Sequence, residues 1–467
     1  MCRSHRSNHA CLDAAGTTFH STAMAPAHSA IDEVWQTLLR HAGKQRSAHS
    51  SLDASALIPL RETLQRVGQP ERSLRTVHIA GSKGKGSTAL YLERLLIEHG
   101  YSVATFTSPH LQHWRERFRI GGEPVADQAL LDAVQCVQEA TDVHASTREL
   151  RFFDLLTAIA LVLFARSAPD YTVVETGVGG RFDATNVVHP VLCVLTRIEL
   201  EHADVLGDSI AEIAAQKAGI IKPGIPVVCT ALPFEAHEVV TREARDTGAP
   251  LLLAGHDFDY QSERTGPATQ RVTYRGKNTL TFDLAAAAPA LVENAALALA
   301  ACENLPLPTN PDAIRAAFAR MLPARCEFLS GTPAIVIDAA HTPASFNALR
   351  EAIGAIPHQR AHFLVACSNE RHVHELVARV GDIAERVVAT LADPAYTVPP
   401  EHLAQLLRQA YPLLEVGVCE EPASALDETL RGLADNDLLC VTGSTYLAGH
   451  IRTLLSDRVR TNRSPVS

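Results

Sequence analysis

The sequence has little lysine and a deficit of positive charge. Lysine and arginine together number 42 against 52 acidic residues, which gives a net charge of −10 and an isoelectric point near 6.1. Only six of the basic residues are lysines: Lys44, Lys83, Lys85, Lys217, Lys222 and Lys277. The chain therefore offers no general basic surface, which argues against nucleic acid as its main partner. Anions must be bound by local features, and each retained lysine is a candidate for a specific role.

The chain also lacks paired-cysteine motifs and long apolar runs. Its ten cysteines include no C-x-x-C pair, which excludes a zinc ribbon or a thioredoxin motif, and the place of several of them in apolar runs favours a reducing cytoplasm. No uncharged apolar stretch approaches the ~18 residues of a membrane span, so we expect a cytoplasmic protein with no membrane partner. Residues 1–23 are polar without an apolar core segment; we expect a disordered leader there, with Met24 as an alternative start.

Apolar β-branched runs alternate with helical patterns along the chain, and 467 residues fit two to four domains. Buried parallel strands are predicted at 76–80, 171–175, 191–195 and 225–229. Helices are predicted at 86–99, 127–141, 153–167, 209–218, 234–247 and 291–303. This alternation predicts an α/β fold with helices on the faces of a parallel sheet. Residues 271–284 instead alternate around a Gly-Lys-Asn turn and predict an antiparallel hairpin at a sheet edge.

A proline-rich segment at 305–311 predicts a domain boundary. The alternation then restarts, with strands predicted at 334–338, 361–366, 385–390, 414–418 and 437–442, and helices at 344–354, 371–380, 400–410, 422–433 and 445–456. We therefore expect one α/β domain over 24–305 and a second over 306–467.

The sharpest motif is the glycine-rich segment 81–88, Gly-Ser-Lys-Gly-Lys-Gly-Ser-Thr, between a predicted strand and a predicted helix. Its glycines let backbone N–H groups surround a phosphate, and the helix N-terminus adds partial positive charge. Lys85 can reach the β- and γ-phosphates, while the Ser87 hydroxyl can bind Mg²⁺. The spacing differs from the usual P-loop, so the motif predicts a variant phosphate-binding loop; the alternative is a glycine-rich turn with a chance lysine.

Groups that can bind a metal follow the next strands. Glu175 ends a buried strand before a glycine-rich segment, which makes it a candidate Mg²⁺ ligand. His202 follows another strand and is a candidate second ligand, although a lone histidine at such a place more often has a structural role. Lys217 lies late in a predicted helix, where a lysine usually complements the helix C-terminus. Because lysine is scarce, a specific role is favoured, including carbamylation to an anionic ligand.

Further polar groups lie at other predicted strand ends. The loop Thr107-Ser-Pro-His-Leu111, followed by Arg117, places hydroxyls, an imidazole and a guanidinium near the nucleotide; the alternative is an ordinary exposed loop. In the second domain, Asp338 and His341 end a strand, and residues 439–449 form a strand–Gly-Ser–helix turn that ordinary βα-loop chemistry also explains.

Taken in this order, the motifs resemble those of the Mur ligase superfamily, and most of all its folylpolyglutamate synthase and dihydrofolate synthase branch. The resemblance runs from about residue 30 to 455. It rests on the phosphate loop, Thr107–Leu111, the Glu175 segment ending Asp183-Ala-Thr-Asn186, Gln216-Lys217-Ala-Gly, Asp338-x-x-His341 and Thr442-Gly-Ser-x-Tyr446. It implies a P-loop parallel-sheet domain of the Mur ligase central type and a C-terminal Rossmann-like α/β domain.

The resemblance also implies an activity: an ATP-dependent acid–amino-acid ligase that joins glutamate to a folate carboxylate through an acyl phosphate. The ATP site it implies is Gly81, Ser82, Lys83, Gly84, Lys85, Gly86, Ser87, Thr88, Asn294, Arg325, Asp338 and His341. The implied catalytic residues are Lys85, His202 and Lys217. Two Mg²⁺ sites are implied, one at Ser87 and Glu175 and one at Glu175, His202 and carbamylated Lys217. The substrate-binding residues that the resemblance implies are Thr107, Ser108, Pro109, His110, Arg117, Phe153 and Asp154. The expected partners are ATP, glutamate and a reduced folate or related carboxylate, bound by a monomer that closes over them.

Several positions depart from the family pattern. The family's Gly-x-His-Gln is replaced within Pro289–Asn294, and its Pro-Gly-Arg is Pro323-Ala-Arg325 here. Its Asp-Gly-Ala-His is Asp338-Ala-Ala-His341, and its Asp-His is Glu201-His202. Two alternatives therefore stay open: dihydrofolate synthase or a related Mur-type ligase with a non-folate acceptor, and a catalytically decayed ATP-binding protein. Retention of the phosphate and metal positions argues against the decayed form.

Overall fold

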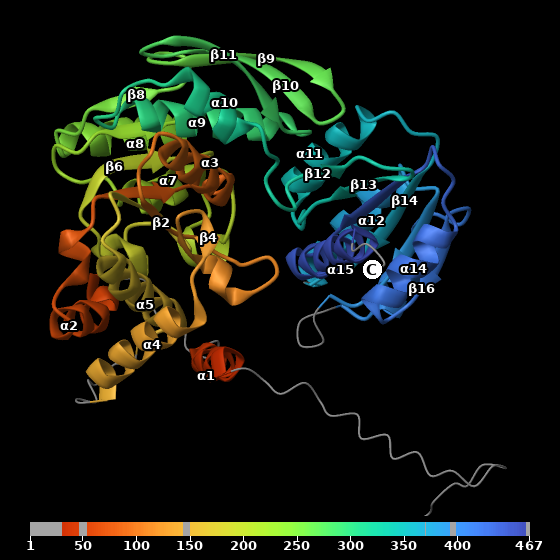
Figure 1. Ribbon diagram of the computed structural model, residues 1–467, viewed down its shortest axis with the longest axis horizontal. Helices are drawn as coiled ribbons and strands as arrows, with labels where there is room; N and C mark the ends of the chain where they lie inside the picture. Colours follow the sequence, from red (N-terminus) through yellow and green to blue (C-terminus); the bar gives the residue numbers. More distant parts are fainter. Residues whose placement is uncertain (1–29, 46–53, 143–149, 369, 393–397, 464–467) are drawn as a thin grey trace, which may run out of the picture.

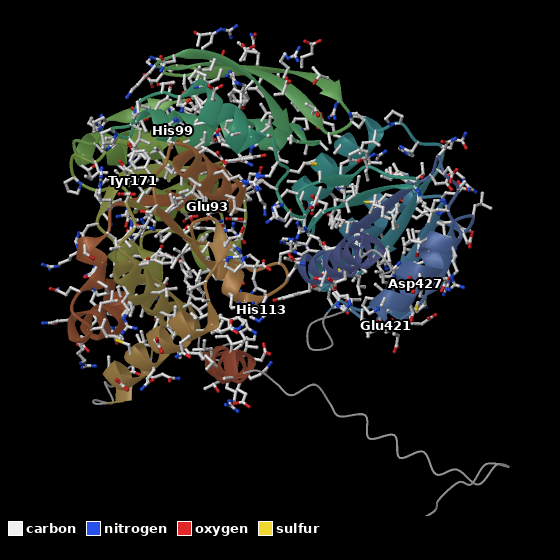
Figure 2. The ribbon with its side chains drawn as sticks, viewed as in Figure 1. Glu93, His99, His113, Tyr171, Glu421 and Asp427 are labelled. Carbon is white, nitrogen blue, oxygen red and sulfur yellow. The ribbon has the colours of Figure 1, made fainter. Side chains whose placement is uncertain are left out.

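The computed structural model describes residues 30–45, 54–142, 150–368, 370–392 and 398–463. The expected leader at 1–23 and the alternative start at Met24 lie outside the described residues. Two α/β domains stand side by side, with the first coloured red to green and the second blue (Figure 1). Side chains fill the space between sheet and helices in both, and Tyr171 is buried within the first (Figure 2). In the part of the chain that the structure describes, no helix is long and apolar enough to cross a membrane.

The first domain is built on an eight-stranded sheet in the order β4-β3-β2-β5-β1-β6-β7-β8. The strands are β1 (Thr76–Ala80), β2 (Val103–Phe106), β3 (Phe118–Ile120), β4 (Glu123–Pro124), β5 (Tyr171–Glu175), β6 (Pro190–Leu195), β7 (Val227–Cys229) and β8 (Leu251–Leu253). The strands from β2 to β8 in this order run parallel, and β3 and β4 extend the edge antiparallel. The buried runs at β1 and β5 explain why a parallel sheet could be predicted, because such strands are covered on both faces.

Helices cover both faces of this sheet. They are α1 (Ala30–Gln45), α2 (Ile58–Arg66), α3 (Lys85–Glu98), α4 (Asp127–Asp142), α5 (Phe152–Ser167), α6 (Ala203–Leu206), α7 (Ile210–Ala218), α8 (Phe234–Asp246) and α9 (Pro289–Glu303). Val77 and Ile79 of β1 pack with α3 and α9, whereas Ala80 packs with α7 on the opposite face. This alternation along one strand places the carboxyl end of β1 between two helical layers.

The predicted hairpin forms, but in a different place. Strands β9 (Asp259–Gly266), β10 (Thr269–Arg275) and β11 (Thr279–Ala285) make a separate antiparallel sheet rather than an edge of the main one. Buried Val272, Phe282 and Leu284 turn one face of it toward α9. The strand β9 carries few apolar residues, so its periodicity gave no signal.

The second domain has a six-stranded sheet in the order β12-β13-β17-β14-β15-β16. Its strands are β12 (Glu327–Leu329), β13 (Ala334–Ile337), β14 (Ala361–Val365), β15 (Arg386–Ala389), β16 (Glu415–Val418) and β17 (Leu438–Thr442). Its helices are α11 (Pro343–Gly354), α12 (Val373–Gly381), α13 (Pro400–Ala410), α14 (Pro422–Arg431) and α15 (Thr445–Arg463). All strands except β12 run parallel, which confirms the expected Rossmann-like architecture.

Helix α10 (Pro311–Phe318) lies beyond the predicted boundary at 305/306, yet it packs on the first domain. Its Phe318 ring stacks on Phe282 of β11, with 4.7 Å between ring centroids, and meets Tyr91 of α3 edge-on at 5.5 Å. We propose that the domain boundary lies just after this helix, before β12.

This packing predicts the effect of Phe318→Ala. Truncating a buried aromatic ring should lower the free energy of unfolding of the first domain by about 3–5 kcal/mol. Both tryptophans of the chain, Trp35 and Trp114, lie in the first domain, so their fluorescence during urea denaturation reports that domain alone. Phe234→Ala, which truncates an aromatic ring that is 72% exposed in the first domain, is the control and should change stability by less than about 0.5 kcal/mol. A cost below about 1 kcal/mol for Phe318→Ala would contradict the assignment of α10 to the first domain.

Candidate functional site

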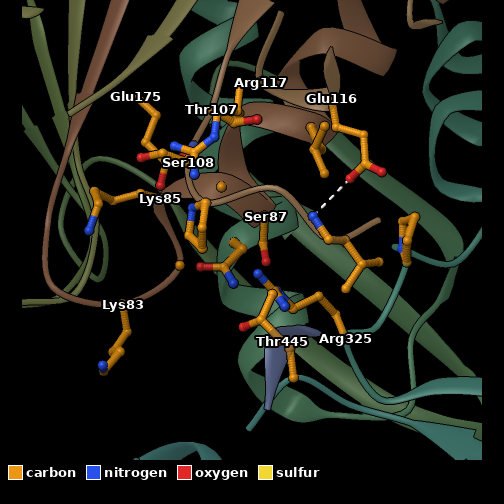
Figure 3. Close-up of a pocket in the computed structure, with 18 of the residues that line it drawn as sticks. Lys83, Lys85, Ser87, Thr107, Ser108, Glu116, Arg117, Glu175, Arg325 and Thr445 are labelled. Carbon is orange, nitrogen blue, oxygen red and sulfur yellow. Dashed lines mark hydrogen bonds between the residues drawn. The ribbon is translucent and has the colours of Figure 1, made fainter. Parts of the chain in front are cut away.

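A cavity of about 1360 Å³ lies between the two domains. The first domain contributes the glycine-rich loop, the 107–117 segment and the end of β5; the second contributes residues 323–326 and 338–345. Figure 3 shows Lys85, Ser87 and Glu175 from the first domain in the same pocket as Arg325 and Thr445 from the second. Residues from both sides of the boundary thus converge on one space.

The glycine-rich loop joins β1 to α3 in a conformation that requires its glycines. Gly81 has φ +151 and Gly84 has φ +89, in the region that favours glycine. A Cβ at Gly81 would collide with the Thr196 side chain, and one at Gly84 with the Asn294 side chain. The loop ends at the N-terminus of α3, where free backbone N–H groups and the helix dipole suit an anion. The loop therefore has the strand–glycine turn–helix arrangement that the sequence predicts, and its role in phosphate binding stays a prediction.

Glu175 ends β5 and is only 3% exposed. Its carboxylate accepts a hydrogen bond from the backbone N–H of Ser108 at 2.9 Å and faces Gly86 of the glycine-rich loop. Burial raises the pKa of Glu175, opposed by Lys85, by the Ser108 N–H and by Arg325 and Arg117. This carboxylate thus joins the glycine-rich loop to the 107–111 loop.

The segment after Glu175 is held by Asp183. The Asp183 carboxylate accepts hydrogen bonds from the backbone N–H groups of Gly177 and Val178 at 3.0 and 3.1 Å. Phe153 packs so closely on Gly177 that a Cβ there would meet its ring. The Asp183 carboxylate and the Phe153 ring therefore hold the segment after Glu175 in place.

Two lysines share one carbonyl beneath the glycine-rich loop. Lys85 and Lys217 each donate from Nζ to the Gly81 carbonyl oxygen at 2.9 Å, and Lys217 also binds Glu201 Oε1 at 2.8 Å. The Lys217 side chain is 1% exposed, and burial together with nearby Lys85 lowers its pKa to about 8, with Glu201 opposing the shift. Lys217 is thus an amine whose proton is held less tightly than usual. His202 lines the cavity beside this group.

The 107–117 segment is tied down by Glu116. Its carboxylate accepts hydrogen bonds from three consecutive backbone N–H groups, those of Leu111, Gln112 and His113, at 2.9–3.0 Å. Figure 3 shows Glu116 beside Arg117 in the pocket wall, with one of these bonds drawn. The Glu116 carboxylate therefore fixes the backbone conformation of this loop.

Arg117 is 7% exposed and lies at the cavity wall. Its Nε donates to His110 Nδ1 at 3.0 Å, and its guanidinium lies over the Trp35 ring, 5.6 Å from the centroid. Burial, with Arg117 nearby, lowers the pKa of His110 to about 3, so the imidazole is neutral and can accept this bond. Trp35 of α1 in turn stacks on Trp114 at 5.2 Å.

In the second domain, Asp338 holds the turn that presents Arg325. The Asp338 carboxylate is 7% exposed and accepts from the backbone N–H groups of Cys326 at 2.6 Å and Ala340 at 2.7 Å. Arg325 and His341 both line the cavity.

The cavity brings together most of the residues that the sequence singles out. Those lining it are Ser82, Lys83, Gly84, Lys85, Gly86, Ser87, Thr107, Ser108, Pro109, Arg117, Phe153, Glu175, His202, Asn294, Arg325, Asp338 and His341. Those outside its lining are Gly81, Thr88, His110, Asp154 and Lys217. Asp154 is buried and binds Arg151 through both oxygens at 2.8–2.9 Å, so its contact with the cavity is through that arginine. The roles of these residues stay predictions.

Sequence reasoning missed four residues that shape the site: Trp35, Glu116, Glu327 and Arg452. Trp35 belongs to a helix that the sequence analysis did not predict. Glu116 stands between two arginines in the sequence, and a carboxylate so placed looks like part of a solvated charge cluster. Glu327 and Arg452 meet across 125 residues of sequence, which no local pattern reveals.

Comparisons with known proteins agree on one family. Residues 324–445 match the family model "Mur ligase, glutamate ligase domain". The dihydrofolate synthase/folylpolyglutamate synthase of Bacillus subtilis is 30% identical over 408 residues, covering 85% of this chain and 94% of that protein. The solved folylpolyglutamate synthase of Mycobacterium tuberculosis, complexed with ADP and AMPPCP, superposes with a TM-score of 0.81 at 27% identity, over 91% of this chain and 98% of that one. E. coli FolC in complex with DHPP and ADP gives 0.78 at 26% identity, over 90% and 98%.

The glycine-rich loop supplies a matched pair of substitutions. Gly100 has φ +87, almost the value at Gly84, but a Cβ at Gly100 meets nothing within 4 Å. Gly100→Ala should cost about 1–2 kcal/mol of first-domain stability from backbone strain alone. Gly84→Ala should cost about 1–3 kcal/mol more, because the buried Asn294 amide must move. Tryptophan fluorescence in urea measures both variants, and equal costs would show that Asn294 yields freely.

Proposed function

The chain belongs to the folylpolyglutamate synthase and dihydrofolate synthase family of the Mur ligase superfamily, and we propose that it extends a reduced folate by glutamate. As a member it is an ATP-dependent acid–amino-acid ligase. The observation that carries the proposal is the position of Glu175, which faces Gly86 of the phosphate loop and accepts a hydrogen bond from Ser108 of the 107–111 loop. One buried carboxylate therefore holds the nucleotide side and the acceptor side against each other.

In the proposed reaction, a folate carboxylate oxygen attacks the γ-phosphorus of ATP, the bond from that phosphorus to the β–γ bridging oxygen breaks, and ADP leaves an acyl phosphate behind. The neutral glutamate amine then attacks the acyl carbon and loses a proton, and phosphate leaves with the pair of electrons from the carbon–oxygen bond. Phosphoryl transfer depends mainly on positioning and charge neutralisation. The α3 N-terminus and Lys85 lie on one side of the cavity for this task, and Arg325 on the other. Because Arg325 comes from the second domain, catalysis would depend on domain closure.

The residues present suit Mg²⁺. Ser87 and Glu175 carry oxygen ligands of the kind that Mg²⁺ prefers, and both line the same cavity. Burial raises the pKa of Glu175 despite the nearby cationic groups, so a bound cation would stabilise its carboxylate. Ser87 and Glu175 would hold one Mg²⁺, and Glu175, His202 and carbamylated Lys217 a second. A bound Mg²⁺ would neutralise charge on the phosphates. Among the described residues no group of three His, Cys, Asp or Glu side chains could hold a metal, so the second site would require the carbamate.

Departures from the family pattern define the alternative acceptors. The segment Pro289–Asn294 departs from the family pattern, and its Glu293 binds Arg197 at 2.7 Å. Dihydropteroate or a non-folate acid is the alternative acceptor, and a decayed ATP-binding protein is the alternative outside catalysis. The cavity retains Lys85, Ser87, Glu175 and His202 together, which supports an active ligase. We propose further that the protein uses glutamate, acts as a monomer and resides in the cytoplasm.

A phosphate-release assay separates these alternatives. With ATP, glutamate and Mg²⁺, we expect release with tetrahydrofolate and a product heavier by one or more glutamates in mass spectrometry. Release only with dihydropteroate would assign dihydrofolate synthase activity, and release only with another acid would replace folate as the acceptor. The absence of release with every acceptor would support the decayed protein.

Lys217→Ala tests the proposed carbamate. We expect kcat to fall by orders of magnitude, because both the carbamate and the bond to the Gly81 carbonyl are lost. The exposed Lys277→Ala removes an ammonium that donates to the Glu303 backbone carbonyl, outside the cavity lining, and should leave kcat unchanged. Removal of CO₂ from wild-type enzyme should also lower kcat, with recovery on adding bicarbonate. Unchanged turnover of Lys217→Ala, or indifference to CO₂, would contradict the carbamate.

A further inference from the structure

The turn that presents Arg325 is strained on both sides. Ala324 has φ +48 and Cys326 has φ +47, which places two non-glycine residues in the left-handed region around one arginine. Such conformations persist where the surroundings impose them. Asp338 accepts from the Cys326 N–H at 2.6 Å, and Glu327 accepts from the Ala324 N–H at 2.9 Å. The position of Arg325 therefore depends on two carboxylates.

One of these carboxylates is itself held by α15. The Glu327 side chain is 11% exposed, and the Nε of Arg452 donates to both of its oxygens at 2.9 and 3.1 Å. A buried carboxylate that binds one guanidinium and one backbone N–H has little freedom to shift without losing one of them. Arg452 thus fixes Glu327, and through Glu327 the strained turn.

Arg452 also reaches the 107–117 loop of the first domain. Its Nη1 donates to Gln112 Oε1 at 3.0 Å, and Gln112 Nε2 donates to Thr453 Oγ1 at 2.6 Å. One turn earlier, Gly449 lies so close to the Leu111 carbonyl that a Cβ there would collide with it. The loop therefore docks on α15 through a side-chain clamp and a glycine contact, and Figure 1 shows it reaching toward that helix.

We propose that Arg452 is a positioning residue that links docking of the acceptor loop to placement of Arg325. The inference rests on the proposed function, because it takes the 107–117 loop as the acceptor side and Arg325 as a nucleotide contact. With Gln112 docked, Arg452 is held at its Nη1 end and presents Nε to Glu327. When the loop leaves, Arg452 loses that anchor and the strained turn loses part of its support. Arg325 is therefore held in position only while the 107–117 loop is docked on α15.

Arg452→Gln is the central variant, with Arg458→Gln as its matched control. Arg458 lies on the same helix and binds Asp427, on the face of the second domain turned away from the first (Figure 2). We expect Arg452→Gln to lower kcat about tenfold or more and to weaken AMPPCP binding at least threefold, although Arg452 is placed against the loop rather than the nucleotide. Arg452→Lys should recover part of the loss. Arg458→Gln should match wild type.

Two further variants distinguish a relay from a structural role. Gly449→Ala improves the helix propensity of α15 but fills the space that the Leu111 carbonyl occupies, so it should keep the fold and still lower kcat/KM for the acceptor. In a double-mutant cycle, Gln112→Ala should lower kcat about tenfold alone and less than about twofold in a Glu327→Gln background, because both act through Arg452.

Additive effects of Gln112→Ala and Glu327→Gln would overturn the relay. A raised KM for glutamate or acceptor with unchanged kcat in Arg452→Gln would also overturn it, because that pattern marks direct substrate binding. If wild-type enzyme turned over no folate acceptor, the proposed function would fail by itself. The nucleotide half of the relay would then be decided by AMPPCP affinity, and equal affinities of Arg452→Gln and Arg458→Gln would refute it.

Discussion

The site is organised around one buried negative charge, the carboxylate of Glu175. A carboxylate in this position is unfavourable unless it is hydrogen-bonded or compensated by positive charge. The groups that oppose the rise in its pKa come from three places: Lys85 in the phosphate loop, the Ser108 N–H and Arg117 in the acceptor loop, and Arg325 in the second domain. The same charge thus draws together the parts that a ligase must bring to one point. A divalent cation bound beside Glu175 would complete this compensation.

The sequence could locate this centre because parallel strands end at one edge of a sheet. Glu175 and the glycine-rich loop follow β5 and β1, which are neighbours, so two motifs 90 residues apart in sequence had to meet. The buried β-branched runs made those strands recognisable, and the strand–helix alternation predicted nearly every strand and helix of the second domain. The same logic placed Asp338 at a strand end beside β17. Local pattern and topology were sufficient for these residues.

Other features depend on packing that no local pattern encodes. The Trp35 helix and α10 pack through aromatic side chains whose partners, Trp114 and Phe282, lie elsewhere in the chain. The family pattern places Asp154 among the substrate residues, but its two oxygens bind Arg151, so its role passes through a neighbour. Left-handed backbone is predictable at glycine and not at Ala324, where surrounding hydrogen bonds impose it. The link from Gln112 through Arg452 to Glu327 spans both domains and exists only when they are assembled.

The division of labour between lysine and arginine explains the unusual composition. Arginine is used where a planar fork must bind two acceptors, as in Arg151 with Asp154 and Arg452 with Glu327 and Gln112. Lysine is kept where a compact ammonium must fit against a carbonyl, and Lys85 and Lys217 converge on that of Gly81. A guanidinium cannot be deprotonated, whereas burial lowers the pKa of the Lys217 amine to about 8. Only a lysine at position 217 could therefore donate to the Gly81 carbonyl as an ammonium and also form the proposed anionic carbamate, whereas an exposed lysine such as Lys277 has no such requirement.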